Sequence, residues 1–276
     1  MIMLNRATCM AFTSHKGGTG KTTSCLSIGG YLARTGKKVA IIDLDPEANT
    51  TLGLGFESED LGNTIFDAFL DHCNGYTGCK LKESIYNTKI QNLDLIPSEL
   101  DLGVMEKLLH EIPHRSRVLY ALIEDIRCFY DFILVDLPPS SPLLTINGIF
   151  AADHLIIPID PSAFSLKSLK NMKQNLQEIR NHEGHEVESI TLLLTRYQKT
   201  RILSRILGKK NASDELKKNL ENIYGELFLI PFSNEVFESQ MAGTPLPYFA
   251  PGCSAAKAYQ RVTDHMIKML QADEEI

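Results

Sequence analysis

Three glycines and two lysines lie within six residues near the start of the sequence, in the run Lys16-Gly17-Gly18-Thr19-Gly20-Lys21-Thr22-Thr23. Glycine lets a backbone wrap closely around phosphate oxygens, where a Cβ atom would collide. A helix that opens at Lys21 would also point free amide N–H groups and the positive end of its dipole at the same anion. The run therefore predicts a Walker A loop in which residues 17–23 bind the phosphates of ATP.

The polar residues of this loop have distinct expected roles. Lys21 would reach the β- and γ-phosphates, and the Thr22 hydroxyl would bind Mg²⁺. His15 stands where the general motif has its first glycine, and Lys16 adds a second cation, which matches the deviant form of the motif. Lys16 is either a solvated lysine or a cation that contacts the phosphates of a second subunit, like an arginine finger supplied in trans. An ordinary glycine-rich turn is the alternative for the whole run, and the two lysines argue against it.

Two aspartates follow the apolar run at residues 38–43. Asp43 and Asp45 fall on one face of an extended chain, and Pro46 ends the strand. Ligands of open α/β sheets bind at the carboxyl ends of strands, where these acids lie. We expect Asp45 to orient the attacking water and Asp43 to act through the metal shell. Capping of the following turn is the alternative for Asp43.

A third acid, Asp136, follows four apolar residues. Many strands end in an acid, but together with a Walker A loop this one predicts a Walker B residue that holds Mg²⁺ through water. Ser140, Ser141 and Pro142 follow, and we expect them to form a mobile segment that senses the γ-phosphate.

Short apolar runs predict the strands that must position these groups. Most of these runs are continuously apolar and do not alternate with polar residues, which is typical of parallel strands buried on both faces. They span residues 8–13, 38–43, 93–97, 132–136, 154–158, 189–195 and 227–231. Helical patterns alternate with them at residues 21–35, 105–129 (with a break near Pro113), 166–180, 212–224 and 254–272. The alternation predicts one doubly wound α/β domain over residues 1–276, with a mostly parallel sheet and helices on both faces.

Composition excludes several other classes of protein. The 276 residues are 43% apolar and carry a net charge of −6, so a generally basic nucleic-acid binder is not indicated. Six cysteines occur without a CxxC pair, and the pairs His110/His114 and His182/His185 lack a third ligand, so we expect no metal site of these types. No signal peptide and no apolar stretch of about 18 residues is present, so we expect a soluble cytoplasmic protein.

The three motifs together resemble the ParA/Soj partition ATPases of the wider ParA/MinD group. The resemblance is carried by residues 15–23, 43–50 and 136–140, and it extends over residues 95–98, 187–197 and 229–247. It implies an ATP-dependent sandwich homodimer in which Lys16 contacts the opposing nucleotide, Lys21 the bound one, and Asp45 governs a slow, partner-stimulated hydrolysis. It also implies non-specific DNA binding, a ParB-like centromere-binding activator, and segregation of plasmid or chromosomal DNA on the nucleoid.

The resemblance also implies adenine contacts from late loops, at Arg196, Pro231 and Phe232. Relatives often carry Pro-Arg-Asn where this chain has Pro231-Phe232-Ser233, so the details of the base pocket differ. Some partition ATPases have an N-terminal helix-turn-helix extension, and we expect none here because the sequence begins a few residues before its first strand.

A basic segment predicts where DNA would bind. Six basic residues and no acid lie between positions 196 and 210, and five of them form the expected DNA contact: Lys199, Arg201, Arg205, Lys209 and Lys210. The alternative is a solvated surface. A MinD-like membrane cycle would need a basic amphipathic tail, whereas this chain ends in acidic residues. Redox relatives would need paired cysteines, and a positioning ATPase for another cargo stays an alternative.

Overall fold

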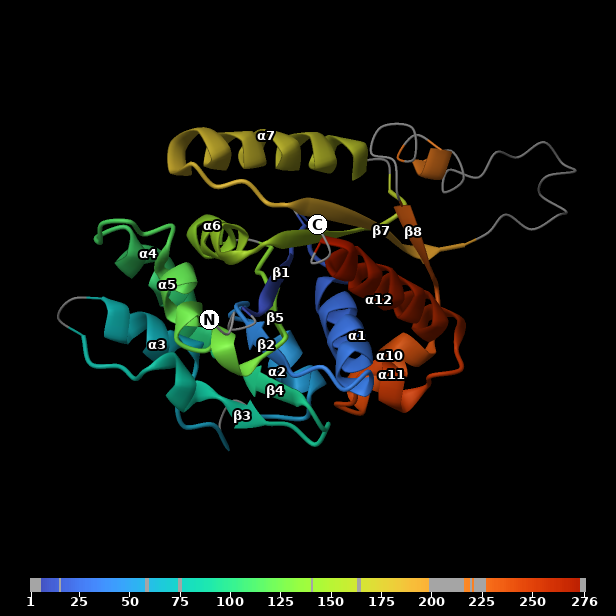
Figure 1. Ribbon diagram of the computed structural model, residues 1–276, viewed down its shortest axis with the longest axis horizontal. Helices are drawn as coiled ribbons and strands as arrows, with labels where there is room; N and C mark the ends of the chain where they lie inside the picture. The colour runs from blue at the N-terminus through green and yellow to red at the C-terminus, as the bar shows by residue number, and fades with distance from the viewer. Residues whose placement is uncertain are drawn as a thin grey trace, which may run out of the picture.

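The computed structural model describes residues 6–14, 16–57, 60–73, 76–139, 141–162, 165–198, 216–218, 220 and 227–273. One eight-stranded sheet runs through them in the order β3-β4-β2-β5-β1-β6-β7-β8 (Figure 1). Every neighbouring pair is parallel except β3 and β4. The strands are β1 (Thr8–Phe12), β2 (Val39–Asp43), β3 (Tyr86–Asn87), β4 (Leu93–Ile96), β5 (Phe132–Asp136), β6 (His154–Ile159), β7 (Ser189–Tyr197) and β8 (Leu227–Pro231).

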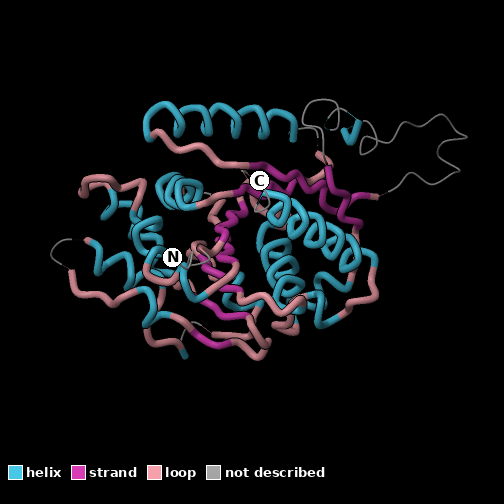
Figure 2. Tube along the Cα trace, viewed as in Figure 1, coloured by secondary structure: helices cyan, strands magenta, loops and turns pink. Residues whose placement is uncertain are grey.

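Helices cover both faces of the sheet, so that strands lie between two helical layers (Figure 2). Successive strand residues alternate between two buried clusters: Ala40 and Ile42 pack into one, and Val39 and Ile41 into the other. The first cluster lies under α3 (Ile65–His72), α4 (Met105–Leu109), α5 (Val118–Glu124), α6 (Pro142–Ala151) and α7 (Ser165–Glu183). The second lies under α1 (Lys21–Arg34), α11 (Leu246–Phe249) and α12 (Ser254–Asp273). The doubly wound α/β fold is therefore confirmed.

Shorter elements complete the fold. The helices α2 (Asn49–Gly53) and α10 (Glu235–Met241) contact each other, and 3-10 turns lie at Leu81–Ser84, Leu100–Val104 and Arg127–Phe129. Of the helix expected at residues 212–224, only residues 216–218 and 220 are described, and these are helical. Among the described residues, no helix combines the length and apolar character needed to span a bilayer.

The sequence analysis missed several elements, among them α6, which begins within the segment that was expected to be mobile. Pro142, expected in a mobile segment, is instead the first residue of α6, where a proline costs no hydrogen bond and its φ suits the helix. The Glu106 carboxylate of α4 accepts bonds from the Leu143 amide at 3.0 Å and from the Ser141 hydroxyl. The segment after Asp136 is thus bonded to α4 in this structure, and its expected role in sensing the γ-phosphate stays a prediction. Ser140 lies outside the described residues.

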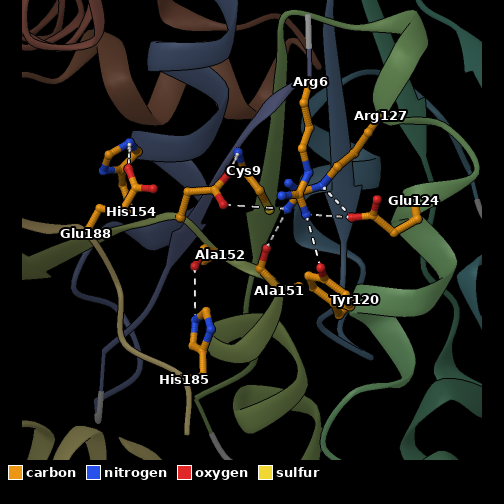
Figure 3. Close-up of polar contacts among 11 residues, drawn as sticks. Arg6, Cys9, Tyr120, Glu124, Arg127, Ala151, Ala152, His154, His185 and Glu188 are labelled. Atoms are coloured by element: carbon orange, nitrogen blue, oxygen red, sulfur yellow. Dashed lines mark hydrogen bonds and ion pairs between the residues drawn. The ribbon is translucent and has the colours of Figure 1, made fainter. Parts of the chain in front are cut away.

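A buried arginine, Arg127, lies in a network of polar contacts beside the amino ends of β1 and β6 (Figure 3). Arg127 is 3% exposed, and its guanidinium donates to the Ala151 carbonyl at 3.1 Å and pairs with Glu124 at 3.3 Å. Arg6 donates to the same Glu124 carboxylate at 2.8 Å, and Asp153 accepts a bond from the Cys9 amide at 2.7 Å. These contacts hold β1, α5 and β6 together, so we assign this network a structural role.

Candidate active site

The glycine-rich loop lies between β1 and α1, as the sequence predicts. Gly18 (φ 72°) and Gly20 (φ 92°) have left-handed backbones, which glycine adopts without strain. Among the described residues, and apart from the immediate chain neighbours, no heavy atom lies within 4 Å of the position where a Cβ would stand at Gly17 or Gly18, so there is room for phosphate beside the backbone. The Thr19 and Ser14 hydroxyls are hydrogen-bonded to each other at 2.8 Å, and this bond restrains the loop.

Residues distant in sequence also restrain the loop. The Thr195 hydroxyl, near the carboxyl end of β7, shares its one proton between the Thr19 carbonyl at 2.8 Å and the Ile159 carbonyl at 3.1 Å. A second contact comes from α10, where the side-chain amide of Gln240 donates to the Thr23 hydroxyl at 2.9 Å. The sequence analysis missed Thr195 and Gln240 because neither belongs to a motif.

Two of the predicted acids are neighbours in the sheet. Asp43 and Asp136 are paired in register at the carboxyl ends of β2 and β5, and both are fully buried. The Thr22 hydroxyl donates to Asp136 Oδ2 at 2.6 Å. Asp136 Oδ1 is buried and has no hydrogen-bond partner among the described residues. An orphaned carboxylate oxygen beside the Thr22 hydroxyl fits a hydrated divalent cation, because such a group gains a partner when the cation binds.

The described residues contain no group of three or more His, Cys, Asp or Glu side chains that could hold a metal ion. A cation at Asp136 would therefore depend on oxygens supplied by a ligand. Mg²⁺ is typically held in this way, by one or two carboxylates together with phosphate oxygens and water. The residues present thus fit Mg²⁺ bound together with a nucleotide.

Burial shifts the acids toward their neutral forms. Desolvation, followed by repulsion from Asp136, raises the pKa of Asp43 to about 7. Desolvation also raises the pKa of Asp136 to about 6, although the Thr22 hydroxyl and the Lys21 charge oppose the shift. The pKa of Asp45 is raised by desolvation as well, against a bond from the Glu47 amide and the Lys21 charge. The site is therefore short of positive charge when no cation is bound.

This shortage predicts a pH dependence of stability. Asp43 and Asp136 bind protons more tightly in the folded chain than in the unfolded chain, so the free energy of unfolding falls as pH rises from about 4 to about 7. At about 1.4 kcal/mol per pKa unit, we expect the metal-free protein to lose about 2–4 kcal/mol between pH 5 and pH 8. Urea unfolding in EDTA at both values measures this loss. Asp43→Asn should reduce this loss of unfolding free energy by at least half. Asp125→Asn, which removes an exposed acid, should leave the loss unchanged. Equal losses in wild type and D43N would contradict the assignment.

Asp45 lies two residues beyond the end of β2 and is 6% exposed. Its amide donates to Asp43 Oδ1 at 3.2 Å, and its own Oδ1 accepts from the Glu47 amide at 3.1 Å. Lys21, at the start of α1, is 7% exposed and close enough to affect the pKa of Asp45. The structure thus brings together Lys21, Thr22, Asp43, Asp45 and Asp136.

Lys16 is paired within its own chain. Its ammonium lies 2.8 Å from Asp160 Oδ2, just beyond the end of β6, and the lysine side chain is 51% exposed. The sequence analysis did not identify Asp160 as a partner. The expected contact of Lys16 with a second subunit stays a prediction, and it requires this ion pair to open.

The residues expected at the adenine lie at the carboxyl ends of the neighbouring strands β7 and β8. Tyr197 and Pro231 are paired in register, and the Phe232 amide donates to the Tyr197 carbonyl at 3.2 Å. Arg196 has a left-handed backbone (φ 52°) at a β-bulge and directly follows Thr195, which binds the glycine-rich loop. Phe232 is 52% exposed. Their contact with a base stays a prediction, and Lys199, Arg201, Arg205, Lys209 and Lys210 lie outside the described residues.

A parallel sheet with a glycine-rich loop between β1 and α1, and with acids at the ends of β2 and β5, defines a P-loop NTPase. Residues 7–189 match a family model described as an AAA domain. The chain belongs to the ParA/MinD family of P-loop ATPases.

Relatives and solved structures agree with this assignment. The chain is 30% identical over 253 residues to the sporulation initiation inhibitor protein Soj of Bacillus subtilis, covering 91% of this chain and 94% of Soj. It is 27% identical over 261 residues to the chromosome-partitioning ATPase Soj of Treponema pallidum, covering 94% and 96%. In fold it is similar to an ATP complex of McdA from Cyanothece (TM-score 0.82, 23% identity, 95% and 97% covered). It is also similar to the septum site-determining protein MinD of Pyrococcus horikoshii complexed with Mg-ADP (TM-score 0.75, 23% identity, 96% and 97% covered).

Proposed function

We propose that this chain binds ATP with Mg²⁺ and hydrolyses the γ-phosphate bond, and that it uses this cycle to partition DNA. The observation that carries the proposal is the orphaned, buried Asp136 Oδ1, which lies on the same carboxylate that accepts the Thr22 hydroxyl. Relatives named as partitioning ATPases and neighbours solved with ATP or Mg-ADP support it.

Each group of the site has a defined task in this proposal. Amides of the loop and the Lys21 ammonium bind the triphosphate, while Thr22, Asp43 and Asp136 hold the Mg²⁺ shell. Mg²⁺ supplies charge neutralisation at the phosphate oxygens. Asp45 orients the water for attack, and its closeness to Lys21, whose charge opposes the rise in the pKa of Asp45, supports this role.

The finer part of the proposal concerns assembly. Lys16 leaves Asp160 and contacts the nucleotide of a second copy, so that ATP closes a sandwich homodimer. Dimerisation doubles the basic segment at positions 199–210 and raises affinity for DNA of any sequence, because each added phosphate contact releases counterions. A ParB-like partner then stimulates hydrolysis and returns the protein to the weakly bound state.

One set of variants tests these steps separately. With ATP and Mg²⁺ we expect light scattering to report twice the 30.8 kDa of one chain, together with DNA retention at low salt. Lys16→Ala should stay monomeric at full ATP occupancy and lose DNA retention. The double reversal Arg201→Glu with Arg205→Glu should still dimerise but bind DNA at least about tenfold more weakly, because four phosphate contacts are lost per dimer.

A double reversal elsewhere provides the matched control. Lys82→Glu with Lys89→Glu changes net charge by the same amount at two exposed positions, and we expect wild-type DNA retention. An ATP dimer formed by K16A would contradict the trans contact. Undiminished DNA retention by the Arg201 and Arg205 reversal would place the DNA surface elsewhere.

A further inference from the structure

Two adjacent threonines at the start of α2 each bind a different one of the buried acids. Thr50 Oγ1 donates to Asp136 Oδ2 at 2.8 Å, across 86 residues of sequence. Thr51 Oγ1 and the Thr51 amide both donate to Asp43 Oδ2 at 2.8 Å. Both threonines are fully buried. The first turn of α2 therefore bridges β2 and β5 at the level of the acids.

The two threonines have different surroundings. Thr51 Oγ1 also accepts a bond from the Ser98 amide at 3.1 Å, just beyond β4, so Thr51 anchors α2 to a strand that carries none of the three acids. Thr50, in contrast, donates to Asp136. Thr50 therefore connects α2 to the carboxylate of Asp136.

The Thr50 bond restrains the orientation of the Asp136 carboxylate. Thr50 and Thr22 both donate to Oδ2, at 2.8 Å and 2.6 Å, and Oδ1 has no partner among the described residues. Two donors on one oxygen fix the plane of a carboxylate more tightly than one donor does. Without Thr50, the Thr22 bond would restrain this plane less tightly, because χ2 of aspartate is a broad torsion.

The same threonine is joined to Asp45 through a single tight turn. The Ala48 amide donates to the Asp45 carbonyl at 2.8 Å, and Ala48 has a left-handed backbone (φ 53°) immediately before α2. A non-glycine residue in this conformation persists only where its surroundings hold it. Thr50 therefore connects the Asp136 carboxylate to the turn that carries Asp45.

We propose that Thr50 is a positioning residue: it orients Asp136 for the metal ion and couples that carboxylate to the position of Asp45. This inference rests on the proposed binding of ATP with Mg²⁺. A merely structural role would be limited to satisfying a buried acid, and loss of the hydroxyl would then lower stability without changing metal dependence.

Metal dependence of nucleotide binding is the first readout. The Mg²⁺ concentration that half-saturates binding of a fluorescent ATP analogue should rise about tenfold in Thr50→Val, which corresponds to about 1.4 kcal/mol. Affinity in EDTA should change less than about twofold, because the loop amides and Lys21 are untouched. Thr50→Ser should restore wild-type Mg²⁺ dependence. Thr263→Val is the matched control, since Thr263 is equally buried and its hydroxyl donates to the Tyr259 carbonyl in α12.

Movement of the Asp45 turn is the second readout. The chain contains no tryptophan, so Glu47→Trp places one reporter at an exposed position of the turn. Mg²⁺ added to the ADP-bound reporter should change its fluorescence. We expect Thr50→Val to remove most of this change and Thr50→Ser to keep it.

The outcomes separate the inference from the function on which it rests. If the nucleotide affinity of the wild-type protein does not depend on Mg²⁺, the proposed function itself is overturned. Wild-type Mg²⁺ dependence in a folded Thr50→Val protein would overturn the role of Thr50 alone. Thr50→Ala provides a second hydroxyl deletion of smaller volume, and circular dichroism with thermal melting confirms that each variant is folded. An equal rise in the half-saturating Mg²⁺ concentration of Thr263→Val would also overturn the proposal.

Discussion

Replacement of Lys21 by alanine is expected to lower affinity for ATP by at least about 100-fold, which corresponds to about 2.7 kcal/mol. Lys21 is 7% exposed at the start of α1, so bonds from its ammonium to phosphate oxygens would form in a site with little competing water. Charge-assisted bonds of this kind are about twice as strong as neutral ones. Isothermal titration of ATP in the presence of Mg²⁺ measures the loss directly.

An exposed lysine outside the site provides the control for Lys21. Lys37 pairs with Asp131 at 3.7 Å near the amino ends of the strands, and its side chain is 40% exposed. Lys37→Ala should bind ATP like the wild type. Melting of K21A should be recorded as well, because Lys21 opposes the upward pKa shifts of Asp45 and Asp136. A folded K21A protein that keeps ATP affinity within threefold would remove the basis for every functional step proposed above.

Asp45→Ala is expected to reduce the turnover of ATP by at least about 100-fold while leaving ATP affinity within a fewfold of wild type, since positioned proton acceptors contribute about 10²–10⁴ in rate. The physical reason is the separation of tasks in the site. Asp136 and Thr22 are bonded to each other at the proposed Mg²⁺ site, whereas Asp45 lies beyond β2 and near Lys21. Release of inorganic phosphate measures turnover, and titration calorimetry measures binding in the same sample.

The neighbouring Glu47 tests whether the effect belongs to Asp45 or to any carboxylate of the turn. Glu47 is exposed, and its carboxylate accepts a bond from the side-chain amide of Asn49 at 3.0 Å. Glu47→Ala should keep turnover within about threefold of wild type, because surface substitutions away from packed or bonded features have small effects. Turnover of D45A within tenfold of wild type would assign the water-orienting role to another residue.

Local patterns in the sequence predicted most of the sheet and the centre of the site. The glycine-rich loop is contiguous, and its glycines with left-handed backbones are the residues that such a turn requires. Asp43 and Asp136 could be assigned because each ends a continuous apolar run, and the carboxyl ends of parallel strands meet at one edge of a sheet. Elements without such a pattern were missed, among them the two-residue strand β3 and the helix α6 that begins at Pro142.

The partners of these residues were decided by the tertiary structure alone. Lys16 meets Asp160 across 144 residues, and Thr195 meets the Thr19 carbonyl across 176. Strand order places these groups together, and that order depends on how both faces of the sheet are covered. The sequence by itself thus determined which chemistry this chain carries, because phosphate and metal binding need particular residue types at short spacing. The tertiary structure determined how the Asp136 carboxylate is oriented and which side chains restrain the loop, because hydrogen bonds between distant segments form only after the sheet has brought those segments together.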